Sequence, residues 1–301
     1  MSGDVVYIDC SPFMGRLLEE AMPDWRQRML VHIGDPGPDA VVDLAAHAEV
    51  ILNGHTMMDD ELLGRLPQLR RIIFLGSGAS SYIDVRAAAE RGIKVETISG
   101  YGDRSVAEHA AALMFAAARK VAAMDRDLRA GHWEPLEGAE LLGRQLGIIG
   151  FGGIGRSFAE IAKALGMKVA IWNRNPVAAE WRDYAMPLDE LLAGSDVVSL
   201  HLALTEETRG MIGDAEIERM KSGAILINTA RGGLVDADAL LAALAAGKLG
   251  HVGLDVFDEE PLPAGSVWTT LPNVTLTAHA GFKTQDAARR LVSQALDLVF
   301  D

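Results

Sequence analysis

Residues 145–166 read QLGIIGFGGIGRSFAEIAKALG, and this stretch decides the fold of the second half of the chain. A short apolar run is followed by Gly150, Gly152 and Gly155 in GxGxxG spacing, and then by an amphipathic pattern typical of a helix. In that context the first glycine permits a tight turn, the second lets the backbone approach a pyrophosphate, and the third lets helix and strand pack closely. The motif therefore predicts a dinucleotide site with phosphate at the helix N-terminus. The alternative is a plain strand-to-helix glycine turn.

The same unit opens a series of strand-like runs separated by helical patterns. An alanine-rich helix is predicted just before it over residues 106–121, opened by Ser105 and Glu108 in capping-box spacing. Six short apolar runs then indicate a doubly wound parallel sheet of the Rossmann type. These runs lie at residues 145–150, 168–172, 196–202, 224–230, 251–257 and 273–279.

The residues before this series form a second set of strand-like runs. Nearly continuous apolar strands suit a parallel sheet covered on both faces, and they alternate here with amphipathic stretches. The five runs lie at residues 5–9, 28–33, 48–53, 71–76 and 93–97. A last helical pattern, residues 284–300, is long enough to cross back onto this sheet. We therefore predict an α/β fold of two doubly wound parallel-sheet domains: a flavodoxin-like substrate domain, residues 1–98 plus 284–301, and a Rossmann dinucleotide-binding domain, residues 99–283.

Composition excludes several classes of partner. The 301 residues are enough for two domains, and 28 Lys and Arg against 42 Asp and Glu give a formal charge of −14. Such a charge repels phosphate backbones and anionic lipids, so we expect neither a nucleic acid nor a membrane partner. The single cysteine, Cys10, allows no intrachain disulfide. No run of 18 apolar residues occurs, and the N-terminus lacks the pattern of a signal peptide, so the cytoplasm is the expected location.

The end of the second Rossmann strand bears on the choice of cofactor. An NAD site places an acid about 20 residues after the glycines to hold the adenosine ribose hydroxyls. Here the strand ends in KVAIWNRN, with Asn173 and Arg174 at that place. Without a carboxylate to repel a 2′-phosphate, and with a cation to bind one, the site is predicted to prefer NADPH. If Arg174 is only a solvated loop charge, NAD remains the cofactor.

Two of the eight histidines stand at the ends of strand-like runs, where ligands bind in open α/β sheets. These are His201 and His279, and His279 is the better acid/base candidate because the small neighbours in TLTAHAGF leave space for a substrate. A structural capping role is the alternative. The other histidines have ordinary explanations, such as a helical position for His109.

Two charged residues follow other strands of the series. Glu260, in FDEEPLP, is a candidate partner that orients a catalytic histidine and stabilises its imidazolium; a solvated loop charge is the alternative. Arg231 precedes a helix that Asp236 is expected to cap, and a cation in that turn makes sense if an anion lies nearby. A surface arginine paired with an acid is equally open. No histidine pattern typical of a metal site accompanies the acids, so we predict no metal.

The segments GFGGIG, NTARGGLVD, GLDVFDEEPLP and TAHAGF, in this order, resemble the D-isomer-specific 2-hydroxyacid dehydrogenase family. The likeness covers nearly the whole chain. It implies that Arg231 binds and polarises a 2-keto acid, that His279 is the acid/base paired with Glu260, and that Asp255 contacts the nicotinamide. It also implies a homodimer built through the helix around residues 104–121, and a substrate carboxylate bound by backbone amides near Ser77, Gly78 and Ala79.

We therefore predict a reductase that transfers hydride from NAD(P)H to a small 2-keto acid, of the glyoxylate and hydroxypyruvate reductase type. The rival hypothesis is a protein of the same fold that senses dinucleotides and acts through partners. The predicted cofactor-binding residues are Gly150, Gly152, Gly153, Ile154, Gly155, Asn173, Arg174, His201, Thr229, Ala230 and Asp255.

Overall fold

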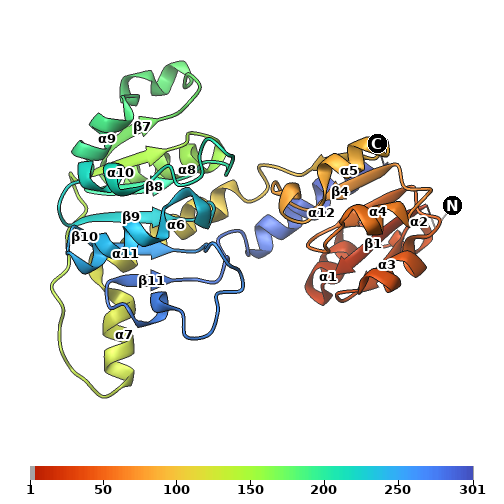
Figure 1. Cartoon of the computed structure of the whole chain (residues 1–301), viewed down its shortest axis with the longest axis horizontal. Coiled ribbons are helices and arrows are strands. Elements are labelled where there is room, and N and C mark those ends of the chain that lie inside the picture. The colour runs from red at the N-terminus through yellow and green to blue at the C-terminus, as the bar shows by residue number, and fades with distance from the viewer. Residues whose placement is uncertain (1–3, 301) are drawn as a thin grey trace. The chain divides into compact units, whose positions relative to one another are not determined.

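The computed structural model describes residues 4–300, whose strands and helices sort into two units (Figure 1). Unit 1 contains the chain up to Gly102 and again from Lys283, and unit 2 runs from Asp103 to Phe282. Each unit has its own parallel sheet and its own core. Residues 1–3 and 301, which the sequence assigns to the first domain, lie outside the described part.

All five strand-like runs of the N-terminal part form strands of one parallel sheet in unit 1. The strand order is β2-β1-β3-β4-β5, the flavodoxin-like order. Chain direction across the sheet reverses between β1 and β3, so this is the point where the carboxyl ends of the strands can open a crevice. The strands are β1 (Val5–Cys10), β2 (Leu30–Ile33), β3 (Val50–Asn53), β4 (Arg71–Phe74) and β5 (Lys94–Thr97).

Helices cover both faces of this sheet, as the apolar strands require. One face packs on a cluster built from β1, β3, β4 and the helices α3 (Pro38–Ala45), α4 (Asp60–Gly64) and α5 (Val85–Glu90). The other packs against α1 (Pro12–Ala21), α2 (Trp25–Arg28) and the C-terminal helix α12 (Gln285–Phe300). The C-terminal helix is thus part of unit 1, with Leu291 and Leu296 buried against the N-terminal elements.

The six strand-like runs of the second series form one parallel sheet in unit 2. Its order is β11-β10-β9-β8-β6-β7, so the chain reverses its direction across the sheet between β6 and β8. Beyond β7, Ala185 makes an isolated parallel bridge to Ile171, where a Rossmann sheet has a further strand. The strands are β6 (Gln145–Ile149), β7 (Lys168–Trp172), β8 (Val197–Leu200), β9 (Ala224–Asn228), β10 (Leu249–Leu254) and β11 (Val274–Leu276).

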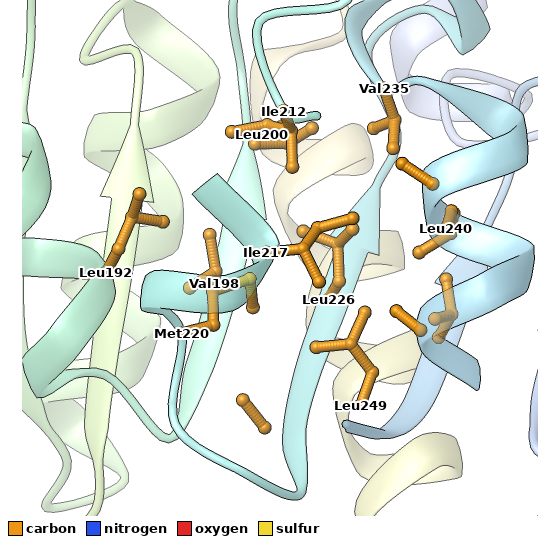
Figure 2. Packing of buried hydrophobic residues seen from close by; sticks show 14 of the residues in the cluster. Leu192, Val198, Leu200, Ile212, Ile217, Met220, Leu226, Val235, Leu240 and Leu249 are labelled. Atoms are coloured by element: carbon orange, nitrogen blue, oxygen red, sulfur yellow. The ribbon is translucent and has the colours of Figure 1, made fainter. Parts of the chain in front are cut away.

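Two helical layers sandwich this second sheet. One consists of α6 (Asp103–Arg119) and α8 (Gly153–Ala164), with α7 (Val121–Arg129) continuing from α6. The other consists of α9 (Leu188–Gly194), α10 (Asp214–Arg219) and α11 (Ala237–Ala245), whose apolar side chains meet those of β8, β9 and β10 (Figure 2). Asp236 caps α11 as the sequence predicts, since its Oδ1 accepts from Ala239 N at 3.0 Å.

The predicted start of the helix after residue 103 is wrong. α6 begins at Asp103, so Ser105 lies inside the helix and does not cap it. Glu108 does not close a capping box either, because its carboxylate pairs with Arg104 one turn earlier, at 2.7 Å. The long helix also ends sooner than predicted, since Lys120 adopts a left-handed conformation with φ 55° and separates α6 from α7.

Within residues 4–300, no helix is long and apolar enough to cross a lipid bilayer.

Candidate active site

The glycine motif forms the turn between β6 and α8. Gly150 has φ +95°, and a Cβ there would lie 2.5 Å from the carbonyl oxygen of His201, so only glycine fits. A Cβ at Gly155 would lie 2.3 Å from the Gly150 carbonyl oxygen, which accounts for close helix–strand packing. A Cβ at Gly152 would meet nothing within 4 Å. The backbone is therefore closely packed at Gly150 and Gly155 and open at Gly152. Helix α8 begins at the next residue, Gly153, with Ile154 in its first turn.

Asn173 and Arg174 follow β7 beside this loop. The amide oxygen of Asn173 accepts from Phe151 N at 2.9 Å, and its amide nitrogen donates to Asn175 O at 2.8 Å. Asn173 therefore ties the glycine loop to the end of the neighbouring strand. Arg174 is exposed, and no carboxylate among residues 4–300 lies within 4.0 Å of its guanidinium. The hydrogen bond from Thr205 chiefly lowers the pKa of Glu207, and the charge of Arg174 contributes to that shift. Without a close ion pair among residues 4–300, the guanidinium can still meet an anion.

Two buried polar atoms at the same edge of the sheet have no protein partner in the described chain: His201 Nδ1 and Thr229 Oγ1. Gly150, His201 and Thr229 each come directly after a strand, and those strands, β6, β8 and β9, are neighbours. Buried polar groups are normally satisfied, so such atoms point to a ligand. Together with the open backbone at Gly152, they fit a dinucleotide bound across the switch point of the sheet. Ala230 continues the chain from Thr229 at this edge.

His201 is unsuited to acid/base work. Its Nε2 forms a hydrogen bond with Ser199 Oγ at 2.9 Å. Burial lowers the pKa of His201 from 6.5 to about 3. The imidazole is therefore neutral at physiological pH. Of the two strand-end histidines, His279 is left as the candidate for proton transfer.

Arg231, Glu260 and His279 follow three adjacent strands, β9, β10 and β11. Parallel strands end at one edge, so their following loops meet there. A Cβ at Gly232 would lie 2.1 Å from the carbonyl carbon of Phe257, so the loop bearing Arg231 lies directly against the loop bearing Glu260. Residues separated by 29 and 19 positions are thereby gathered at one place.

His279 and Glu260 form a direct pair. His279 Nδ1 lies 2.6 Å from Glu260 Oε2, and Glu260 Oε1 accepts from Phe257 N at 2.9 Å. Because an ionised carboxylate only accepts, Nδ1 carries the hydrogen of this bond, and Nε2 is left to hold or release a proton. About a third of each side chain is exposed, 36% for His279 and 33% for Glu260, so the pair can meet a small molecule.

Arg231 is half-buried and carries no acidic partner within the described chain. One of its guanidinium nitrogens donates to the carbonyl of Ala230 at 2.6 Å. The sequence left open whether this arginine pairs with a surface acid, and the structure shows no such pair. The remaining donors of the planar fork are suited to a carboxylate.

Asp255 points into the protein, where it is 1% exposed. Burial would raise the pKa of this carboxyl, but hydrogen bonds from His109, Thr277, Ala280 and Gly281 outweigh it and lower the pKa from 3.8 to about 2. The group is therefore a permanent carboxylate that organises the turn after β11. Its contact with the nicotinamide stays a prediction.

In unit 1, Ser77, Gly78 and Ala79 follow β4 and lead into a one-turn helix, η1 (Ala79–Ser81). None of their three amides donates to a protein acceptor in the part of the chain that the structure describes. The neighbouring loop differs, because Gly54, His55 and Thr56 all donate their amides to the buried carboxylate of Asp9. The free amides after β4 can bind an anion.

The sequence did not single out His109 or Thr277. His109 Nε2 lies 2.9 Å from Thr277 Oγ1 and 3.3 Å from Asp255 Oδ1, so both residues belong to the cluster beneath His279. The Thr277 hydroxyl stands two residues before the candidate histidine, but no local pattern signals a partner 168 positions away.

Comparisons with known proteins add evidence from sequence and from fold. Residues 111–281 match the family described as D-isomer specific 2-hydroxyacid dehydrogenase, NAD binding domain. The chain is similar to the hydroxypyruvate reductase of Thermotoga maritima, 36% identical over 91% of this chain and 98% of that protein. It is 39% identical to the glyoxylate reductase of Aeropyrum pernix over 80% of this chain and 75% of that one. Among solved structures, D-lactate dehydrogenase from Aquifex aeolicus complexed with NAD and lactic acid is 29% identical, with a TM-score of 0.82 over 98% of this chain and 94% of that one.

Proposed function

Because the chain belongs to the D-isomer specific 2-hydroxyacid dehydrogenase family, we propose that it reduces small 2-keto acids to 2-hydroxy acids as a glyoxylate or hydroxypyruvate reductase. The relatives of those names match at 36% and 39% identity over most of their length. The single observation that carries the proposal is the pairing of His279 with Glu260, whose loop packs against Gly232. The preceding residue, Arg231, has no acid partner within residues 4–300.

Three side chains of unit 2 do the work at the substrate. The nicotinamide cofactor, when bound, supplies a hydride for the keto carbon. His279 gives the proton on Nε2 to the keto oxygen, which becomes the hydroxyl, and Glu260 stabilises the imidazolium that holds this proton beforehand. Arg231 binds the carboxylate and offsets charge that develops on the oxygen. In the reverse direction, the same nitrogen accepts the hydroxyl proton.

The amides of Ser77, Gly78 and Ala79 are proposed as a second anchor for the substrate carboxylate. What supports this is that all three lack a protein acceptor within residues 4–300. A three-carbon or two-carbon acid needs no large apolar pocket, which suits glyoxylate and hydroxypyruvate.

The test is reduction by the whole chain. Purified protein is mixed with NADPH or NADH and, in turn, with glyoxylate, hydroxypyruvate, pyruvate or phenylpyruvate, and loss of nicotinamide absorbance is followed. We expect faster turnover with glyoxylate and hydroxypyruvate than with pyruvate and phenylpyruvate. Tight binding of dinucleotide without turnover of any keto acid would instead favour the rival role of a dinucleotide sensor.

We propose NADPH as the preferred cofactor. The place of the usual acid holds Asn173, whose amide oxygen already accepts from the glycine loop. The next residue, Arg174, is exposed and makes no ion pair within 4.0 Å among residues 4–300. A guanidinium there favours a 2′-phosphate, and no carboxylate at residue 173 repels it.

We also propose a homodimer built through the helix around residues 104–121. Support comes from large apolar side chains that stand exposed on α6, on α7 and on the segment that follows, because a subunit interface would bury them. Sedimentation velocity distinguishes a dimer from a monomer, and replacement of Trp133 and Leu128 by serine is expected to shift the distribution to the monomer. The exposed set is Phe115, Val121, Leu128, Trp133 and Leu142, with Trp133 87% exposed.

The cytoplasm is the proposed location, and neither nucleic acid nor membrane is a proposed partner. The net charge of −14 supports the absence of both partners, because it repels phosphate backbones and anionic lipids. The free, buried thiol of Cys10 is consistent with a reducing compartment, where disulfides are rare. Cell fractionation would test it.

A further inference from the structure

The turn that carries His279 is held in an unusual conformation. His279 has φ 48°, in the left-handed region that a residue with a side chain rarely adopts. Asp255 fastens the turn at several points: its carbonyl accepts from His279 N at 2.7 Å, and its carboxylate accepts from Ala280 N at 2.8 Å and Gly281 N at 2.9 Å. The direction of the imidazole therefore depends on how firmly Asp255 is held.

A fourth contact, from the side chain of Thr277, also holds Asp255. Thr277 Oγ1 donates to Asp255 Oδ1 at 2.6 Å, and a hydroxyl has only one hydrogen to give. The contact of 2.9 Å between Thr277 Oγ1 and His109 Nε2 must therefore run the other way, from the imidazole to the hydroxyl oxygen. It follows that His109 Nε2 carries a hydrogen, which also points at Asp255 Oδ1 at 3.3 Å.

The charge of Asp255 makes this donor important. A carboxylate with 1% exposure keeps its charge only if hydrogen bonds replace the lost water. Across residues 4–300, His109 is the one basic side chain within 4.0 Å of it. His109 comes from α6, which packs against β9, β10 and β11, so a rigid helix presents the donor from beneath the sheet.

We propose that His109 is a positioning residue of the reduction: through Thr277 and Asp255 it holds the left-handed turn that aims His279 at the substrate. The inference rests on the proposed function for the step that it serves. It assigns a task to a helical histidine whose spacing alone indicates only an ordinary surface or core position.

The chain contains a matched control for this cluster. His251 Nε2 lies 2.9 Å from Thr275 Oγ1, so the same two groups meet at the same distance as in His109 and Thr277. His251 lies four residues before Asp255, and Thr275 lies two residues before Thr277. Both members are buried, at 4% and 7% exposure, but neither is bonded to Asp255. Loss of this pair costs stability without loosening the turn.

The experiment compares His109→Leu, His109→Gln, Thr277→Val and Thr277→Ser with His251→Leu and Thr275→Val. Misplacement of a reacting group by about 1 Å costs on the order of a hundred-fold in rate, so His109→Leu and Thr277→Val are expected to lower kcat for glyoxylate roughly ten- to a hundred-fold. KM for NADPH should change much less than kcat, because the glycine loop is untouched and only the predicted nicotinamide contact of Asp255 is loosened. His109→Gln and Thr277→Ser keep a donor and a hydroxyl, so most of kcat should return.

A deuterium isotope effect with NADPH labelled at the transferred position separates positioning from general damage. In His109→Leu the effect on kcat should rise, because the chemical step becomes slower than product release. In His251→Leu the melting temperature should fall with kcat and the isotope effect unchanged. Equal loss of kcat in both leucine variants, or full activity in His109→Leu, would overturn the proposal.

A second readout does not need turnover. Long-range 15N–1H spectra of the histidine rings report which nitrogen carries a hydrogen, and we expect His109 Nε2 to be protonated in the wild type and the His279 resonances to move in Thr277→Val. A bare Nε2 on His109 would refute the positioning cluster, even if the chain reduces keto acids. Conversely, if the chain shows this protonation but reduces no keto acid, the proposed function is wrong and the hydrogen-bonded cluster of His109, Thr277 and Asp255 still stands.

Discussion

Replacing Asn173 by aspartate together with Arg174 by alanine should reverse the choice of cofactor. In the structure, the amide oxygen of Asn173 accepts from Phe151 N, and a carboxylate oxygen can keep that bond. The second carboxylate oxygen would replace Nδ2, 2.8 Å from the carbonyl oxygen of Asn175, and the two oxygens repel. The side chain is therefore expected to turn away from Asn175, so that this oxygen can accept the ribose hydroxyls of NADH and repel a 2′-phosphate. Arg174→Ala removes an exposed cation that makes no ion pair within 4.0 Å among residues 4–300, although its charge contributes to the lowered pKa of Glu207.

The size of the effect follows from two contributions. A charge-assisted hydrogen bond between a guanidinium and a phosphate contributes about 1.5–3 kcal/mol, and solvent at the exposed Arg174 favours the lower value, about tenfold in preference. The new carboxylate should add a similar factor in the opposite direction, so the ratio of the two kcat/KM values should move by roughly a hundred-fold. The bond from Asn173 Nδ2 to Asn175 O is lost, which costs about 1 kcal/mol of stability.

The assay measures kcat/KM for NADPH and NADH at saturating glyoxylate, with the melting temperature as a check on folding. Arg219→Ala is the control, because this arginine of α10 pairs with Asp189 and Glu216 on the surface. The control should leave the ratio unchanged. Equal use of both cofactors by the unmodified chain, or an unmoved ratio in the double variant, would refute a role for Arg174 in 2′-phosphate binding.

Three further predictions concern the site and its surroundings. Arg231→Lys should lower kcat/KM for every 2-keto acid roughly ten- to a hundred-fold, since a point donor replaces a planar fork; wild-type kinetics in this variant would contradict carboxylate binding. Glu260→Gln should lower kcat for reduction by a similar factor of roughly ten to a hundred, because a neutral amide stabilises imidazolium less; unchanged kcat would make Glu260 a mere loop charge. Burial and then the charge of Lys120 lower the pKa of His251 from 6.5 to about 4, so the folded state keeps this ring neutral while the unfolded chain takes up a proton below pH 6.5. The free energy of unfolding should therefore fall by about 3 kcal/mol more in the wild type than in His251→Gln between pH 7 and pH 4, and parallel denaturation curves would contradict this.

Much of the site could be predicted from the sequence because it is encoded locally. The glycine turn needs only the strand before it and the helix after it, and both are visible as hydrophobic patterns within residues 145–166. Arg231, Glu260 and His279 could be grouped because each follows a strand-like run, and parallel strands end at one edge of the sheet. Periodicity and topology therefore sufficed to predict both sheets and to place three candidate residues at one sheet edge, whereas their catalytic roles came from the family resemblance and stay predictions.

The errors and omissions arose where tertiary contacts decide. Ser105 and Glu108 have capping-box spacing, but the helix begins at Asp103 and Glu108 pairs with Arg104, which local spacing cannot show. In the sequence, nothing distinguishes His109 from other helical histidines, and its role depends on the packing of α6 against β10 and β11. Only in this packing does its Nε2 meet Thr277, 168 positions away. Such a pairing depends on which face of the helix meets the sheet and at what depth, and these are properties of the packed core that the order of the residues does not display.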